Sequence, residues 1–189
     1  MRKPVLYAAG IVILAIVLIG GWYLATYNGL IQMNENVNAQ WQDVEVQYQR
    51  RADLIPNLVS TVQGYANFEK SVLTEVTAAR SAWTTAQGPE ARVAAANQLE
   101  ATISKLLLVA ENYPDLQASQ NFLALQNELA GTENRVSVER SRYNDAVRDF
   151  NAAIQFFPTS IVANQLGYTA RDYFNSAAGA ESAPNVSFP

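Results

Sequence analysis

A helical pattern of apolar residues between positions 37 and 83 constrains the fold more than any other feature of the sequence. Apolar side chains recur there at alternating steps of four and three residues, which gathers them on one face of a helix. At 1.5 Å per residue, this face is about 70 Å long. Its members are Val37, Trp41, Val44, Tyr48, Ile55, Leu58, Val62, Tyr65, Val72, Val76, Ala79 and Trp83. The pattern predicts one long, coiled-coil-like helix packed against partner helices.

Pro56 lies in the middle of this pattern. A proline removes one backbone N–H group and kinks a helix. Because the apolar stripe keeps its phase on both sides of Pro56, we expect a bent but continuous helix that ends near Gln87, at a Gly-Pro pair. In the alternative, Asp53 caps a new helix that has Pro56 in its first turn.

Three further helices are predicted, at about residues 89–111, 116–157 and 160–175. The inner face of the first of these is formed by Val93, Ala96, Leu99, Ile103, Leu106 and Ala110. The stripe of the second consists of Phe122, Leu129, Val136, Tyr143, Val147, Phe150, Ile154 and Phe157. We therefore predict an all-α fold, an elongated antiparallel bundle of about four helices with a very long first helix.

A separate apolar run at residues 5–25 predicts a transmembrane helix. The run is about 30 Å long as a helix, which matches the hydrocarbon thickness of a bilayer. Aromatic residues lie near both of its ends, as in interfacial belts. The alternative is a cleaved signal peptide, whose apolar region is normally shorter. We expect an anchor at residues 1–27, a helical bundle domain at 28–176 and a mobile tail at 177–189.

Charged residues interrupt both long stripes. Arg51 and Glu69 fall on the first stripe, and Glu133 and Arg140 fall on the second. A buried charge without a partner costs several kcal/mol, so we expect these four side chains to form a buried polar network. The interpretation we favour is that such pairs fix the register between helices. Two alternatives are a polar ligand or proton site inside the bundle, and stripe positions that are partly exposed.

The composition argues against several classes of function. The chain has no cysteine and no histidine, which removes thiolate nucleophiles and the commonest general base and metal ligand. Its formal net charge is -4, unlike the basic surface of a nucleic-acid-binding protein. No phosphate-binding loop or nucleophile motif is present. We expect no cofactor, no metal, no nucleic-acid partner and no enzymatic activity.

The sequence resembles the LemA family of bacterial membrane-anchored helical proteins over nearly its whole length. The resemblance is carried by YNGL at 27–30, WQDVEVQYQRRADLIPNLVSTVQGYANFE at 41–69, AAR at 78–80, ENYPDL at 111–116, LQNELAGTENRVSVERSRYNDAVRDFN at 125–151, FP at 157–158 and APNVSFP at 183–189. It implies a helical bundle beyond one transmembrane helix and no established catalytic activity.

These observations favour a non-enzymatic scaffold that self-associates at the cell envelope and shapes or organises the membrane. The alternative is a sensor or adaptor domain that binds a ligand or another membrane protein, such as a protease. The unequal helix lengths leave part of the apolar stripe uncovered within one chain, and exposed apolar strips mark interfaces. We therefore expect a cyclic homo-oligomer with Trp41 and Tyr48 in or near the subunit contact.

The first prediction concerns topology. Arg2 and Lys3 flank one side of the apolar run, whereas Glu35 is the first charge on the other side. The positive-inside rule then places the amino terminus in the cytoplasm and the bundle outside the cytoplasmic membrane. A reporter that is active only in the cytoplasm, fused after Pro189, should stay silent. Strong activity of that fusion would reverse the orientation.

Overall fold

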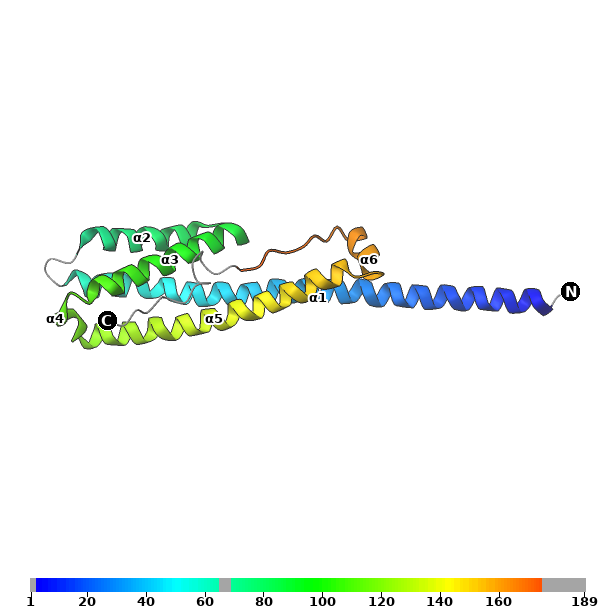
Figure 1. Cartoon of the computed structure of the whole chain (residues 1–189), viewed down its shortest axis with the longest axis horizontal. Coiled ribbons are helices and arrows are strands. Elements are labelled where there is room, and N and C mark those ends of the chain that lie inside the picture. The colour runs from blue at the N-terminus through cyan, green and yellow to red at the C-terminus, as the bar shows by residue number, and fades with distance from the viewer. Residues whose placement is uncertain (1–2, 65–68, 175–189) are drawn as a thin grey trace, which may run out of the picture. The chain divides into compact units, whose positions relative to one another are not determined.

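The computed structural model describes residues 3–64 and 69–174, and every regular element in this part of the chain is an α-helix. The predicted all-α bundle is thereby confirmed (Figure 1). The chain divides into two compact units. Of the described residues, unit 1 contains 3–41 and 142–173, and unit 2 contains 42–64, 69–141 and Phe174. The expected tail at 177–189 lies outside the described residues.

The first helix, α1 (Lys3–Gln63), passes through Pro56 without interruption. Continuity at this proline agrees with the expectation, and a separate helix capped by Asp53 is not formed. Because Pro56 has no N–H group, the carbonyl of Ala52 loses its usual helical donor. Arg80 supplies the replacement, since its Nε donates to the Ala52 oxygen at 3.0 Å. A side chain of another helix thus repairs the gap that the proline leaves in α1.

The expectation that one helix runs on to Gln87 is wrong. α1 ends at Gln63, and a second helix, α2 (Lys70–Thr85), begins after Glu69. Gly64 follows the end of α1, and glycine weakens a helix by about 1 kcal/mol relative to alanine. The apolar pattern gave no sign of this break because both helices bury faces that remain in phase with each other.

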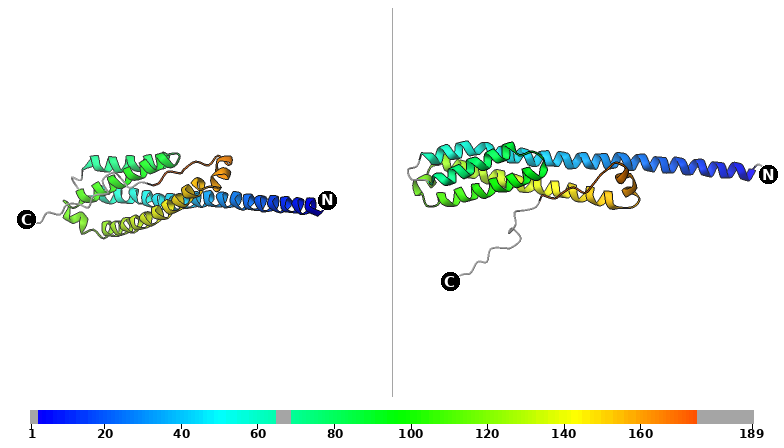
Figure 2. Two further views of the ribbon diagram at one scale, coloured as in Figure 1. Left: turned by 45° about the vertical axis from the view of Figure 1, so that its right-hand side comes forward. Right: turned by 90° about the horizontal axis from the view of Figure 1, so that it is seen from above.

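Unit 2 is a bundle of four helical segments. The carboxy-terminal part of α1, α2, α3 (Pro89–Ala110) and the first part of α5 (Gln120–Gln155) lie side by side, and the short α4 (Pro114–Gln117) joins α3 to α5 (Figures 1 and 2). Gly88, which precedes α3, has a φ of +82°, a conformation that glycine adopts without strain.

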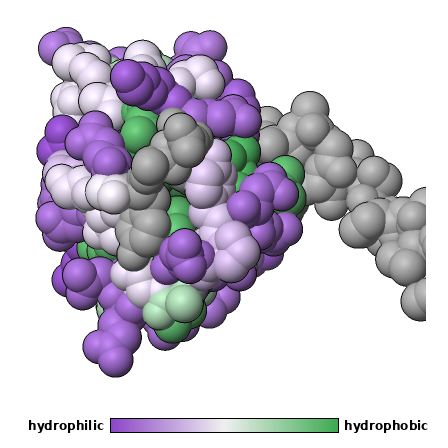
Figure 3. Space-filling view, turned by 90° about the vertical axis from the view of Figure 1, so that its left-hand side faces the viewer, coloured by the Kyte–Doolittle hydropathy of each residue, from purple (hydrophilic) through white to green (hydrophobic). Residues whose placement is uncertain are grey.

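The core of the bundle consists of the predicted stripes. Most stripe residues on α1, α2 and α3 are buried, as are those of α5 up to Ile154. The segment of α3 from Lys105 to Ala110, however, is not surrounded on all sides, since Leu108 is exposed. The end of unit 2 that carries α4 presents mainly hydrophilic side chains to solvent, with small hydrophobic areas between them (Figure 3).

Unit 1 combines the amino-terminal part of α1 with the end of α5 and a short helix, α6 (Thr159–Gln165). Side chains 7–22 of α1 are exposed all around the helix, and from residue 7 onward Leu30 is the first that is buried. Farther along, Trp41 on α1 meets Tyr143 on α5 edge-to-face, with ring centroids 5.3 Å apart. The apolar stripe of α1 at Trp41 is therefore covered by the chain itself.

The last predicted helix is shorter than expected, because it ends at Gln165 rather than near residue 175. Gly167 has a φ of +71°, and its N–H donates to the Asn164 carbonyl at 3.1 Å. The N–H of Tyr168 reaches the Ala163 carbonyl at 3.0 Å. These two bonds form a Schellman motif, which ends a helix at a glycine.

The repair of α1 at Pro56 generates the second prediction. Arg80→Met should lower the free energy of unfolding by about 1.5–3 kcal/mol, because the Ala52 carbonyl loses a charged donor. In the Pro56→Ala background the same substitution should cost less than half as much, since the new backbone N–H can bond to Ala52. Urea unfolding of the full-length protein in detergent, followed by circular dichroism, measures this double-mutant cycle.

The exposed Arg135 provides the control for this cycle. Arg135→Met should change stability by less than about 0.5 kcal/mol in either background. Equal losses for Arg80→Met with and without Pro56 would mean that the two residues act independently.

Candidate functional site

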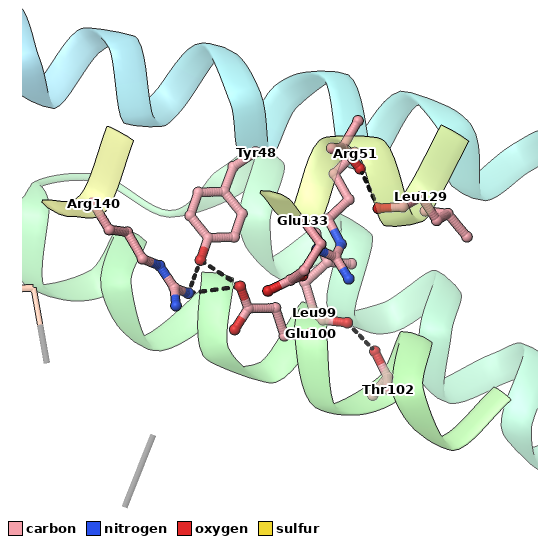
Figure 4. A network of polar contacts seen from close by, with 9 residues as sticks. Tyr48, Arg51, Leu99, Glu100, Thr102, Leu129, Glu133 and Arg140 are labelled. Atoms are coloured by element: carbon pink, nitrogen blue, oxygen red, sulfur yellow. Dashed lines mark hydrogen bonds and ion pairs between the residues drawn. The ribbon is translucent and has the colours of Figure 1, made fainter. Parts of the chain in front are cut away.

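Five polar side chains meet inside unit 2, between three helices (Figure 4). Tyr48 and Arg51 lie one turn apart on α1, Glu100 lies on α3, and Glu133 and Arg140 lie two turns apart on α5. We call these five residues the ionic cluster. The spacing of each pair places both of its members on the same side of its helix, toward the other helices.

Glu100 is the acceptor at one end of the cluster. The Tyr48 hydroxyl donates to its Oε1 at 2.7 Å, and Nη2 of Arg140 lies 2.6 Å from the same oxygen. Arg140 also donates to the Tyr48 hydroxyl oxygen. The three side chains thus form a closed triangle of contacts that joins α1, α3 and α5.

Arg51 forms the other end of the cluster through an ion pair with Glu133. The two partners differ in their surroundings, because Arg51 is only 5% exposed whereas the Glu133 side chain is 45% exposed. The guanidinium is therefore held inside the bundle, and its carboxylate partner reaches it from the edge.

Aromatic rings surround the cationic part of the triangle. The guanidinium carbon of Arg140 lies 4.4 Å from the ring centroid of Phe174 and 5.3 Å from that of Tyr48. The Tyr48 ring in turn packs against Trp83 of α2, at a centroid distance of 5.1 Å. These faces carry negative electrostatic potential and so stabilise a cation that has lost part of its hydration. Through Trp83, the cluster also contacts the fourth helical segment of unit 2.

Burial dominates the electrostatics of the cluster. It raises the pKa of Glu100, and the nearby charge of Arg51 opposes that rise. It lowers the pKa of Arg51, against the opposing effect of Glu100, and it lowers the pKa of Arg140 to about 10. Each glutamate of the cluster has an arginine beside it, Glu133 beside Arg51 and Glu100 beside Arg140.

The arrangement is suited to holding helices in register. Its two arginines and two glutamates balance in charge, and breaking such a set by removing one partner leaves an uncompensated buried charge. Among the described residues, no three His, Cys, Asp or Glu side chains gather closely enough to hold a metal ion. The geometry thus favours one pairing of the helices, because the glutamates and arginines of the cluster contact one another.

Three of the four charged residues singled out from the sequence belong to the cluster: Arg51, Glu133 and Arg140. Glu69 does not, because it is exposed at the N-cap of α2. Its exposure contradicts the expected burial. The cause is the break after Gln63, because it makes Glu69 the start of α2 rather than a position in the middle of a long helix. A carboxylate there is stabilised by the helix dipole.

Sequence reasoning missed Glu100 and the polar role of Tyr48. A signal for Glu100 was present, since it lies four residues after the buried Ala96 and three before the buried Ile103. That spacing puts it on the inner face of α3. Tyr48 was counted as an apolar stripe residue, although a buried tyrosine hydroxyl normally finds a hydrogen-bond partner.

The expected subunit contact also changes. Tyr48 has an exposed fraction of 0%, which contradicts its expected place at a surface between subunits. Trp41 is half-buried against Tyr143 of its own chain. The chain folds back after Gln63, so Trp83 of α2 packs on Tyr48, and Tyr143 of α5 covers Trp41. The expected uncovered strip is therefore not formed at these two residues.

These features define an all-α protein with one long apolar-ended helix and a bundle held by an internal ionic cluster. Residues 40–188 match the LemA family, and the chain belongs to that family. The family expected from the sequence motifs is thereby confirmed.

Several named proteins are similar to this chain. Magnetosome protein MamQ 2 of Paramagnetospirillum magneticum is 25% identical over 92% of this chain and 73% of its own length. Magnetosome protein MamQ of Magnetospirillum gryphiswaldense is 24% identical over 92% of this chain and 74% of its own. Protein LemA of Metamycoplasma hominis is 31% identical over 76% of this chain and 66% of its own.

The third prediction tests the ionic cluster. Arg51→Met should lower the free energy of unfolding by about 3 kcal/mol, at the lower end of the range for a broken buried pair, because the half-exposed Glu133 regains some water. Adding Glu133→Leu should restore most of the loss, since a well-packed apolar pair can replace a buried ion pair. The exposed neighbour Arg50 is the control, and Arg50→Met should be nearly neutral.

The pH dependence of the Arg51→Met variant provides a second readout. Without Arg51, the pKa of Glu100 rises further above its value of 4.5 in the unfolded chain. The folded variant then binds more protons than the unfolded one, so its stability increases as pH falls through the raised pKa toward 4.5. The loss relative to the parent protein should therefore shrink on acidification. A loss independent of pH would mean that Arg51 and Glu100 are not coupled.

Proposed function

We propose that the protein is a non-enzymatic, membrane-anchored helical scaffold that self-associates at the cell envelope. The bundle would lie outside the cytoplasmic membrane, and its role would be to organise the membrane or the proteins within it. The proposal depends on α1, on the ionic cluster and on the exposed apolar residues of unit 2.

The observation that carries the proposal is the continuity of α1. One described helix is long and apolar enough to cross a bilayer, and it is this helix. Its amino-terminal portion exposes large apolar residues on every side, an arrangement that water disfavours and lipid accepts. Beyond Leu30 the same helix supplies core residues to the folded part of the chain. A signal sequence would also be apolar, but it would not need to continue as a core helix.

The ionic cluster supports a structural rather than a catalytic role. Glu100 and Arg140 are the most buried acid–base pair of the cluster, and each already contacts the other and Tyr48. A general acid or base needs a substrate within hydrogen-bond reach. Side chains that are engaged with one another between three helices are better suited to specifying one packing arrangement.

Self-association is supported by confinement and by the surface of unit 2. Anchored copies share one plane, which raises their effective concentration. Exposed apolar residues that we assign to this surface remain on three helices of unit 2, namely Val46, Leu108 and Val138. These residues replace the covered stripe as the surface through which copies would meet.

The fourth prediction concerns assembly. The chain has no cysteine, so single cysteines report cleanly on contacts. Val46→Cys or Val138→Cys should form disulfides between copies on oxidation in native membranes. Asp53→Cys, at an exposed polar position of α1, is the matched control and should form far fewer.

Native mass spectrometry of the detergent-extracted full-length protein gives an independent measurement. A discrete multimer is the expected result. A monomer that co-purifies with another membrane protein, together with equal cross-linking at all three positions, would overturn the scaffold in favour of the adaptor.

A further inference from the structure

The turn between α5 and α6 exposes an unusual set of apolar side chains. Phe156 and Phe157 are 67% and 82% exposed, and Ile161 on α6 is 57% exposed. We call these three residues the apolar tip. The stripe pattern placed Phe157 inside the core, and this expectation is wrong because α5 ends two residues earlier, at Gln155.

Helix α6, which carries Ile161, lies beside α1 (Figures 1 and 2). The Tyr23 hydroxyl donates to Oε1 of Gln165 at 2.9 Å, which fixes α6 against α1 at this level. Ile161 is one helical turn before Gln165 and on the same side of α6. Tyr23 in turn belongs to the aromatic group at the end of the apolar run, together with Trp22 and Tyr27. The tip is thus continuous with the segment that we assign to the membrane.

The distribution of charge along the chain independently indicates that the tip and the adjacent part of α1 lie in one uncharged region. No charged residue occurs between Lys3 and Glu35, and none occurs between Asp149 and Arg171. The two boundaries meet in space, because Nη2 of Arg171 donates to Oδ1 of Asn34 at 2.8 Å.

From Asn34 to Tyr23, α1 rises about 16 Å. All of α6 and the apolar tip belong to the second uncharged segment, between Asp149 and Arg171. This part of unit 1 is therefore free of charge along both of its chain segments. Such a composition suits a location at the lipid surface rather than in water.

Contacts within unit 1 hold the tip in its exposed position. On α6, Val162 and Ala163 are buried while Ile161 points outward. The segment after α6 is fastened to α5, since the Asn151 amide both donates to the Arg171 carbonyl and accepts from the Arg171 N–H, each at 2.8 Å. The Tyr143 hydroxyl adds a bond to the Asp172 carbonyl at 3.0 Å. These bonds hold α6 in place and leave the two phenylalanines no core to enter.

We propose that the apolar tip inserts into the interfacial layer of the bilayer that α1 spans, as a second and shallow membrane contact. This inference rests on the proposed function, because it requires α1 to be the anchor. Aromatic residues are favoured at the level between headgroups and acyl chains. A second copy of the chain is the competing occupant, but the continuity with α1 and the absence of charge at this level both fit lipid. One helix alone can rotate about its axis, and a second contact fixes which side of unit 1 faces the membrane.

The depth of single labelled cysteines in the full-length protein tests the proposal. Phe157→Cys and Ile161→Cys are labelled with an environment-sensitive fluorophore and reconstituted into phosphatidylcholine–phosphatidylglycerol vesicles. The vesicles carry a nitroxide quencher either near the headgroup or near the bilayer centre. Leu14→Cys, in the middle of the apolar run, reports on the anchor, and Leu123→Cys, an exposed apolar position of unit 2, is the matched control.

The expected result is a blue-shifted emission at Phe157 and Ile161 with strong quenching by the shallow quencher and weak quenching by the deep one. Leu14 should be quenched best by the deep quencher, and Leu123 by neither. If Leu14 is quenched but both tip positions behave like Leu123, the tip proposal is overturned while the anchor stands. A blue shift at the tip that disappears on dilution of the protein in lipid, without quenching, would assign the tip to a second copy. If Leu14 itself is unquenched, the proposed function fails first.

Discussion

The packing of unit 2 depends on the need of buried charges to neutralise one another. Arg51 lies in a core of aliphatic and aromatic side chains, where an unpaired guanidinium would destabilise the fold by several kcal/mol. Glu133 of α5 reaches it, while Glu100 of α3 accepts from Arg140 and from Tyr48 of α1. Hydrophobic stripes alone tolerate sliding by a turn, whereas this set of contacts exists in one register only. The cluster therefore selects one register among those that hydrophobic packing alone would allow.

Most of the fold was predictable because its long helices bury strictly periodic faces. The stripes on α1, α2, α3 and α5 correspond closely to the buried residues, and Pro56 interrupts neither the pattern nor the helix. The places where prediction failed are helix ends. At Gln63 the chain turns back while the pattern continues, and at Gly167 a single positive φ ends α6. Periodicity reports which face is buried and carries little information about where the chain reverses.

The site was only partly predictable for a related reason. A charge on an apolar stripe indicates a group that faces the other helices, which is how Arg51, Glu133 and Arg140 were found, although Glu133 is only half-buried. The same signal misplaced Glu69, because a stripe position at a helix start is exposed. Glu100 was overlooked because it lies at the edge of its stripe, and only the three-dimensional arrangement reveals that Arg140 and Tyr48 both turn toward it.

The bond between Arg80 and the Ala52 carbonyl has a consequence for how sequences of this family can diverge. Pro56 and Arg80 are distant in the chain but form one chemical unit: the proline creates an acceptor without a donor, and the arginine supplies the donor. If the proline is replaced first, the backbone N–H of the new residue can bond to the Ala52 carbonyl, and the arginine is no longer needed as its donor. If the arginine is lost first, the Ala52 oxygen has no donor. The two positions should therefore covary in an ordered way, with the proline lost before the arginine.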